Sequence, residues 1–221
     1  MAYLRQYLKR LNPRAIALAG ILGALLFFGP QASWSHTSKD PEGLSNFASV
    51  TDTLYRGAQP STRGFVTLQH MGVGIIVNFR DERGETASEK REVESLGMKY
   101  VGIPWSGRDE PSDAQVVQFL DLVRTNPQTK IFVHCRRGAD RTGTMVAAYR
   151  IVVQHEPVSV AVAEMNQYHY SHFWLPQLQS YVISLPVRLQ SDALFSAYAP
   201  APAVNPGAAA AATAAAIVPR P

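Results

Sequence analysis

The chain contains a single cysteine, Cys135, which is separated by five residues from Arg141 in the run His-Cys-Arg-Arg-Gly-Ala-Asp-Arg-Thr-Gly. A cysteine at the start of a helix and beside cations is stabilised as a thiolate, the nucleophilic form of the side chain. The guanidinium of Arg141 has a planar fork of donors that can bind two oxygens of a phosphoryl group and stabilise its charge during transfer. The pair therefore predicts transfer of a phosphoryl group to sulfur.

The residues on either side of this run predict the elements that position it. Ile131–Val133 is a short β-branched and aromatic run, which is typical of a buried strand. Gly143–Val153 is apolar on nearly every side, which indicates a buried helix. The loop between them is long enough for peptide N–H groups to turn inward as a nest against the helix N-terminus. Such a nest binds phosphate.

Other residues of the loop are expected to support this chemistry. Thr142 can donate its hydroxyl to the sulfur, and His134 can fix the loop through a hydrogen bond to the backbone. The remaining residues expected to contact bound phosphate are Arg136, Arg137, Gly138 and Ala139. The two extra arginines would favour polyanions, such as inositol polyphosphates or phosphoinositide headgroups, over a lone phosphotyrosine, unless their side chains point away from the site.

The Cys-x5-Arg-Thr-Gly string resembles the signature of the cysteine-dependent protein tyrosine and dual-specificity phosphatases. Rhodanese-type sulfurtransferases have a similar geometry, but their loop is one residue shorter. From about Asn46 to Pro186 the chain resembles a bacterial branch of the small dual-specificity-like phosphatases, through Leu54–Pro60, Val77–Arg80, the loop and the helix around Tyr149. That branch also resembles fungal and plant phosphatases that act on inositol pyrophosphates.

The resemblance implies hydrolysis of phosphomonoesters through a cysteinyl-phosphate intermediate, with no metal or organic cofactor. The expected partner is a phosphorylated substrate, either a phosphoprotein or a phosphorylated small molecule or lipid. A non-catalytic phosphate-binding module is the alternative. That alternative requires the loss of a catalytic residue, and none is lost here.

Two carboxylates compete for the role of general acid. The resemblance implies an Asp in a mobile loop upstream of the cysteine, here Trp105–Pro111, where Asp109 is the first candidate and Glu110 or Asp113 the substitutes. Phosphatases whose loop reads Asp-Arg-Thr, such as the myotubularin-like lipid phosphatases, are thought to use that Asp, which here is Asp140. We place Asp140 ahead because its position beside the phosphate follows from the motif alone.

The alternative for Asp140 is a loop-stabilising pair with Arg136 or Arg137. The spacing of three residues between His169 and His172 is compatible with a metal site, but no cysteine or acidic residue stands near them. We therefore predict no metal site.

Strand-like and helix-like segments alternate along the rest of the chain, which predicts an α/β fold with a mostly parallel central sheet flanked by helices, in a single domain. The expected strands are Val50–Arg56, Val73–Phe79, Lys99–Pro104 and Ile131–Val133. The expected helices, besides Gly143–Val153, are Ser61–Met71, Glu85–Leu96, Ser112–Arg124, Ser159–Tyr168 and Leu175–Leu185.

Ligands of parallel sheets bind beyond the carboxyl ends of the strands, so Arg56, Arg80, the Trp105–Pro111 loop and Cys135 are expected around one mouth. Arg56 and Arg80 are assigned to the substrate, with a structural ion pair as the alternative. The charged face of the Glu85–Leu96 helix, which includes Glu89, is expected to be solvated.

Composition predicts segments outside the catalytic domain. Residues 1–14 carry four basic and no acidic residues, and residues 15–28 are uncharged and apolar. We expect residues 1–35 to be a signal peptide or a membrane anchor attached through residues 15–28, with the protein exported, either periplasmic or facing outward from the inner membrane. Residues 36–45 are then a linker, 46–190 the phosphatase domain and 191–221 an Ala/Pro-rich disordered tail.

The charge balance excludes one class of partner. Once the four basic residues of the leader are set aside, the remaining 17 basic residues equal the 17 acidic ones. The sequence therefore offers no global argument for nucleic-acid binding. A single cysteine also excludes an intramolecular disulfide. The sequence predicts no particular oligomeric state.

Overall fold

The computed structural model describes residues 40–198, which contain a five-stranded sheet in the order β1-β2-β5-β3-β4. Neighbouring strands are parallel except for β1, which pairs antiparallel with β2. The strands are β1 (Ala48–Ser49), β2 (Leu54–Gly57), β3 (Val73–Asn78), β4 (Lys99–Gly102) and β5 (Lys130–His134). The predicted mostly parallel α/β fold is confirmed.

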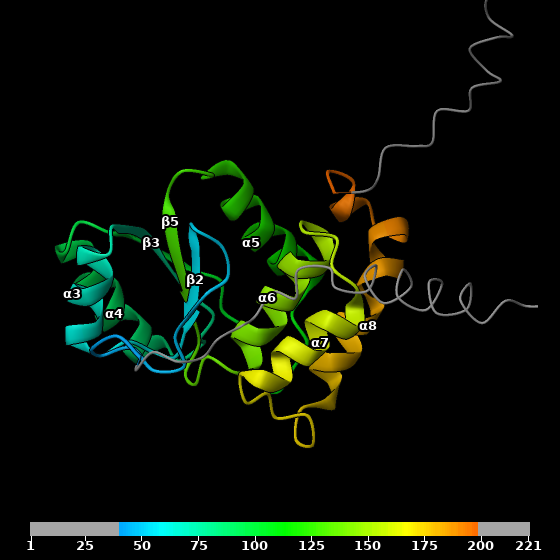
Figure 1. The fold of residues 1–221 in the computed structure, drawn as a ribbon, viewed down its shortest axis with the longest axis horizontal. Helices are drawn as coiled ribbons and strands as arrows, with labels where there is room; N and C mark the ends of the chain where they lie inside the picture. Colours follow the sequence, from blue (N-terminus) through cyan, green and yellow to red (C-terminus); the bar gives the residue numbers. More distant parts are fainter. Residues whose placement is uncertain (1–39, 199–221) are drawn as a thin grey trace, which may run out of the picture. The chain divides into compact units, whose positions relative to one another are not determined.

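Helices cover both faces of the sheet (Figure 1). They are α3 (Thr62–His70), α4 (Arg83–Ser95), α5 (Asp113–Thr125), α6 (Asp140–Val152), α7 (Val158–Gln167) and α8 (Pro176–Ser191). Helices α3 and α4 pack on one face and α5 to α8 on the other, so two apolar clusters form, one on each side of the sheet. The central strand β5 alternates between them, because Phe132 belongs to one cluster and Val133 to the other.

Helix α6 is the centre of the larger cluster. All of its residues from Arg141 to Val152 are buried. A helix surrounded by protein needs no polar face, which explains why the sequence is apolar on nearly every side. The predicted buried helix is confirmed, although it begins at Asp140, three residues before the expected start.

Several predicted boundaries are wrong. Strand β2 begins at Leu54, because Val50 and Thr51 turn back and donate their N–H groups to the carbonyl of Leu54. Helix α8 continues beyond the predicted end at Leu185 and through Pro186. Leu185 is fully buried in the core, and this packing outweighs the hydrogen bond that proline removes.

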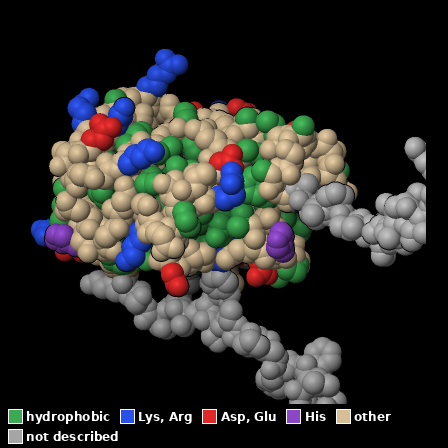
Figure 2. All heavy atoms as spheres, turned by 90° about the horizontal axis from the view of Figure 1, so that it is seen from above, with side chains coloured by type: hydrophobic (Ala, Val, Ile, Leu, Met, Phe, Trp, Pro, Cys, Tyr) green, Lys and Arg blue, Asp and Glu red, His purple; other side chains and the backbone are tan. Residues whose placement is uncertain are grey.

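Packed residues also lie on either side of 46–190, the range predicted for the phosphatase domain. Leu44 is buried in the smaller cluster, and residues 193–195 form a 3-10 helix, η1, whose Phe195 is fully buried. The predicted leader and most of the predicted tail lie in 1–39 and 199–221, outside the described residues. Among residues 40–198, no helix is both long and apolar enough to cross a bilayer. Figure 2 shows acidic and basic side chains interspersed on one face.

Candidate functional site

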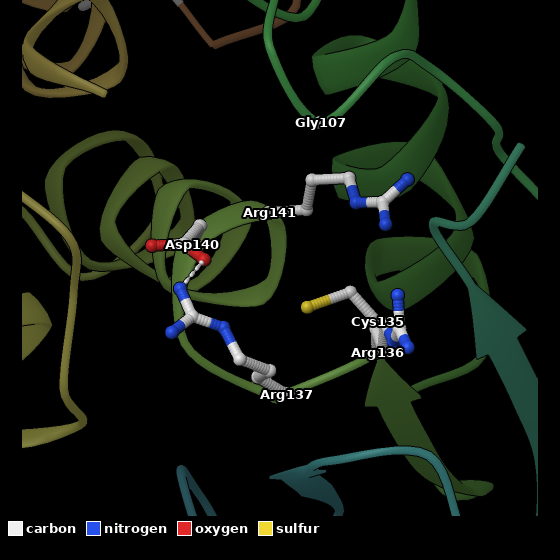
Figure 3. Close-up of a pocket in the computed structure, with 6 residues that line it drawn as sticks. All are labelled: Gly107, Cys135, Arg136, Arg137, Asp140 and Arg141. Carbon is white, nitrogen blue, oxygen red and sulfur yellow. Dashed lines mark hydrogen bonds and ion pairs between the residues drawn. The ribbon is translucent and has the colours of Figure 1, made fainter. Parts of the chain in front are cut away.

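Cys135 directly follows β5 and lines a pocket of about 270 Å³ (Figure 3). Its exposed fraction is 3%. In Figure 3 the thiol points toward the centre of the pocket, with Arg141 on one side and Arg137 and Asp140 on the other. The pocket is lined by Gly107, Cys135, Arg136, Arg137, Asp140 and Arg141. Five of these six residues were predicted individually from the sequence, and Gly107 belongs to the Trp105–Pro111 loop, which was expected at the same place.

The backbone of the phosphate loop, residues 135–141, is held from outside through its carbonyl groups. Four successive carbonyls contact groups outside the loop. Cys135 O lies 3.3 Å from His134 Nδ1, and Arg136 O accepts from Gln59 N at 3.3 Å. Arg137 O accepts from Asn46 Nδ2 at 3.1 Å, and Gly138 O accepts from Arg56 Nη2 at 2.8 Å. Carbonyls that turn outward leave the peptide N–H groups free to face the pocket. This is the nest that an anion requires.

Gly138 allows the loop to make this turn. Its φ is +70°, and a Cβ atom at this position would lie 2.4 Å from the carbonyl carbon of Gly57 at the end of β2. Helix α6 begins immediately afterwards, and no side chain caps its N-terminus. Its first N–H groups therefore add to the positive end of the nest.

Arg56 lies behind the loop and is not among the residues that line the pocket, so the geometry supports the structural alternative over a contact with substrate. Its side chain is 1% exposed, donates to Gly138 O and stacks 3.8 Å from the ring centre of Tyr168. Burial lowers the pKa of Arg56 to about 10, although the nearby carboxylate of Glu164 opposes this shift. Arg56 is thus a buried cation that supports the loop from β2.

Arg80 is also held away from the pocket. It donates to Gln59 Oε1 at 2.8 Å and to Glu82 at 3.2 Å, and it contacts Glu85. Gln59 in turn contacts the phosphate loop through its backbone. The ion-pair alternative is therefore what the geometry supports for Arg80.

Sequence reasoning missed Glu89, which was expected on a solvated helix face. It is 5% exposed and joins three elements: its carboxylate contacts His134 Nε2 at 2.9 Å and accepts from Asn78 Nδ2 at 2.7 Å and Gln59 Nε2 at 2.9 Å. The one available signal was its spacing of four residues from Val93, the other buried residue of α4. The expected backbone contact of His134 is confirmed.

The Arg141 guanidinium lies against the segments that follow β3 and β4. Its Nη1 donates to Asp81 Oδ1 at 2.8 Å and to the carbonyl of Trp105 at 3.1 Å, and Nη2 is 3.7 Å from Glu82 Oε1. The guanidinium also packs against Gly107, where a Cβ atom would approach it within 3.5 Å. Asp81 and Glu82 were not among the predicted site residues.

Asp140 is already engaged at both carboxylate oxygens. Oδ2 accepts from Arg137 Nη2 at 2.5 Å, and Oδ1 accepts from the N–H of Ser171 at 2.9 Å (Figure 3). The ion pair with Arg137, which the sequence offered as the alternative role of Asp140, is therefore present. These contacts give Asp140 an anchoring role, and its part in proton transfer stays a prediction.

The upstream candidates for the general acid lie elsewhere. Asp109 is exposed in the loop that carries Gly107, whereas Asp113, in the first turn of α5, accepts hydrogen bonds from Tyr181 and Arg188. Glu110 faces Arg188 at 3.9 Å. Of these three, Asp109 is the carboxylate without an ion pair in the described part of the chain.

Two further predictions concern side chains near the site. The hydroxyl of Thr142 is buried and has no hydrogen-bond partner among the described residues, so the predicted bond to the sulfur is not made. Residues 40–198 contain no group of three or more His, Cys, Asp or Glu side chains able to hold a metal ion.

Comparison with protein families gives a match over residues 33–181 to the model described as "DSP-PTPase phosphatase fused to NAD+ Kinase". A similar protein is the dual specificity protein phosphatase TpbA of Pseudomonas aeruginosa. It is 29% identical over 160 residues, which cover 69% of this chain and 71% of that protein. Human dual specificity protein phosphatase 26 is 26% identical over 121 residues, covering 52% of this chain and 56% of the human protein.

Solved structures share the fold. A cysteine-to-serine variant of P. aeruginosa TpbA, crystallised with phosphotyrosine, is 23% identical and superposes with a TM-score of 0.58 over 73% of this chain and 99% of its own. The catalytic core of the inositol pyrophosphate phosphatase SIW14 from S. cerevisiae is 18% identical, with a TM-score of 0.55 over 68% of this chain and 94% of its own. At these identities the likeness shows the fold alone.

Proposed function

Because this chain belongs to the cysteine-dependent dual-specificity phosphatase family, we propose that it hydrolyses phosphotyrosine in proteins through a phosphate ester on Cys135. The observation that carries the substrate class is the burial of the nucleophile. Cys135 is 3% exposed where it lines its pocket, so a long, flat aryl phosphate reaches it more easily than the short side chain of phosphoserine.

In the proposed reaction the Cys135 thiolate attacks phosphorus, and the bond from phosphorus to the leaving oxygen breaks. The loop N–H groups and Arg141 bind the equatorial oxygens, which stabilises the transition state. A carboxylic acid protonates the leaving oxygen. Water then attacks the phosphocysteine, and the same carboxylate removes its proton, which releases phosphate and restores the thiolate.

A polyanionic substrate is the second candidate, because the phosphate loop has two additional arginines. Arg137 is occupied by Asp140 and Ser171, whereas Arg136 is exposed, lines the pocket and has no ion-pair partner in the described part of the chain. One free cation favours a single phosphate over an inositol polyphosphate.

Replacing Cys135 with serine tests the mechanism. We expect Cys135→Ser to abolish release of phosphate from p-nitrophenyl phosphate, since a serine hydroxyl is not ionised near neutral pH. The substrate class is tested by comparing the wild-type kcat/KM for phosphotyrosyl and phosphoseryl peptides with that for inositol polyphosphates. Turnover by the Cys135→Ser variant would contradict the cysteinyl-phosphate mechanism. A higher kcat/KM for inositol polyphosphates than for phosphotyrosyl peptides would contradict the proposed substrate class.

A further inference from the structure

The segment between α7 and α8, residues 168–175, carries two large apolar side chains at its tip. Phe173 and Trp174 are 75% and 79% exposed, and their rings pack edge to face with centroids 5.1 Å apart. The N–H groups of Trp174 and Leu175 both donate to the carbonyl of Ser171, which closes the tip into a turn. Adjacent exposed aromatic rings mark a contact surface, because leaving them in water has a free-energy cost.

Ser171 connects this segment to the wall of the catalytic pocket. Its N–H donates to Asp140 Oδ1 at 2.9 Å, and its hydroxyl accepts from Arg137 Nη2 at 2.6 Å. Both partners line the pocket that contains Cys135. In Figure 1 the segment after α7 lies at the same edge of the domain as the carboxyl end of β5. Ser171 is therefore anchored to the wall of the pocket, two residues before the aromatic tip begins.

A second hollow, of about 400 Å³, opens on the same segment and is lined by Asn166, Tyr170, His172 and Gln179. The side-chain amides of Asn166 and Gln179 each offer both donors and an acceptor, which match the N–H and C=O groups of a peptide. The Tyr170 hydroxyl already donates to the carbonyl of Leu175 and accepts from the N–H of Gln179 at the start of α8. Amide groups suit a polypeptide better than a lipid surface.

We propose that residues 166–179 form a docking surface for the polypeptide that flanks the phosphorylated residue. An aromatic or aliphatic side chain of the substrate packs on Phe173 and Trp174, and the adjoining backbone enters the hollow beside Asn166 and Gln179. This inference rests on the proposed function. It goes further in assigning sequence preference to a surface outside the phosphate pocket.

The test compares two phosphotyrosyl peptides that differ only in their flanking residues, leucine and phenylalanine in one and serine in the other. We expect wild-type protein to favour the apolar peptide about tenfold in kcat/KM, mainly through KM. The double variant Phe173→Ala/Trp174→Ala should lose this preference while hydrolysing p-nitrophenyl phosphate at the wild-type rate. The matched control is Ile183→Ala/Val187→Ala, which removes two exposed apolar side chains of α8 and should keep the preference.

Peptide binding to the Cys135→Ser variant, followed by fluorescence anisotropy, separates docking from turnover. If wild-type protein hydrolyses no phosphoester, the proposed function fails. The affinities of the two peptides for the Cys135→Ser variant, measured by anisotropy, still test whether residues 166–179 bind the flanking polypeptide. Equal affinities for the two peptides would overturn the inference. A second result would also overturn it. If wild-type protein co-floats with anionic lipid vesicles and the Phe173→Ala/Trp174→Ala variant does not, while that variant keeps the peptide preference, the tip contacts a membrane and not the substrate.

Discussion

Asp140 and Asp109 differ in what surrounds their carboxylates. A general acid must carry a proton before the reaction begins. Both carboxylate oxygens of Asp140 already accept a hydrogen bond, one from Arg137 and one from the N–H of Ser171. A proton on either oxygen would therefore point at another donor. Asp109 is exposed in the loop whose Gly107 lines the pocket, and it has no ion-pair partner in the described part of the chain. The contacts therefore favour Asp109.

We predict that Asp109→Asn slows hydrolysis of a phosphotyrosyl peptide by roughly 10²–10⁴-fold and removes the basic limb of its pH–rate curve. p-Nitrophenyl phosphate, whose leaving group needs little protonation, should be affected much less. Asp140→Asn should slow both substrates by a similar factor, because the anchored loop is disturbed for each. Steady-state rates across pH for the two variants provide the measurement, and a leaving-group-dependent loss confined to Asp140→Asn would return the role to Asp140.

Gly138 provides a test of the loop conformation at a single residue. We predict that Gly138→Ala lowers kcat/KM at least tenfold and weakens binding of vanadate, because the added Cβ would overlap the end of β2 at a φ of +70°. Gly84→Ala is the control: in α4 the new methyl group meets no atom within 4 Å and should leave activity unchanged. Wild-type kinetics for Gly138→Ala would show that the loop does not depend on this turn.

At the scale of elements, Glu89 joins α4 to the ends of β3 and β5. We predict that Glu89→Ala lowers the free energy of unfolding by about 2–4 kcal/mol, because His134, Asn78 and Gln59 would each lose a buried acceptor. It should also lower kcat, since His134 and Gln59 contact carbonyls of the phosphate loop. Denaturant unfolding and steady-state kinetics give the two readouts.

Glu94→Ala is the matched control for Glu89→Ala, because Glu94 is exposed on the same helix and its one ion pair within residues 40–198 is with Lys90 at 3.9 Å. An exposed pair of this kind contributes a few tenths of a kcal/mol. If both variants are equally stable, the buried carboxylate is not what holds α4 against the sheet.

At the scale of the whole molecule, alkaline pH is predicted to destabilise the domain. Burial raises the pKa of Tyr100 and of Tyr198 to about 12 and also raises that of Tyr181. A phenol whose pKa is higher in the folded state stabilises the fold fully below its unfolded value of about 10. That stability is lost as the pH rises toward 12, because the unfolded chain releases the proton first.

Thermal unfolding between pH 8 and pH 11.5 measures this effect. The midpoint should be level up to about pH 10 and then fall. Tyr198→Phe removes one titrating group and should make the fall less steep, at the cost of the hydrogen bond to Asp121. A midpoint that stays level to pH 11.5 would contradict the prediction.

The sequence by itself determined the nucleophile, the arginine and the loop between them, because the chemistry depends on residues that are neighbours in the chain. Strand, cysteine, fixed spacing and helix are consecutive, so local geometry alone brings Cys135 and Arg141 to one pocket. The same holds for the mostly parallel sheet, whose apolar runs are short and separated by helices. Family membership followed from these local features.

Only the tertiary structure decided the roles of residues whose partners are distant in sequence. The residues next to Arg56 in the sequence do not indicate that its guanidinium donates to Gly138 O. Nor do the neighbours of Glu89 in the sequence indicate that its carboxylate contacts His134. Ser171 meets Asp140 across 31 residues for the same reason. A charged side chain becomes part of a site when packing removes water and leaves it with few partners, and that is a property of the folded arrangement of several elements.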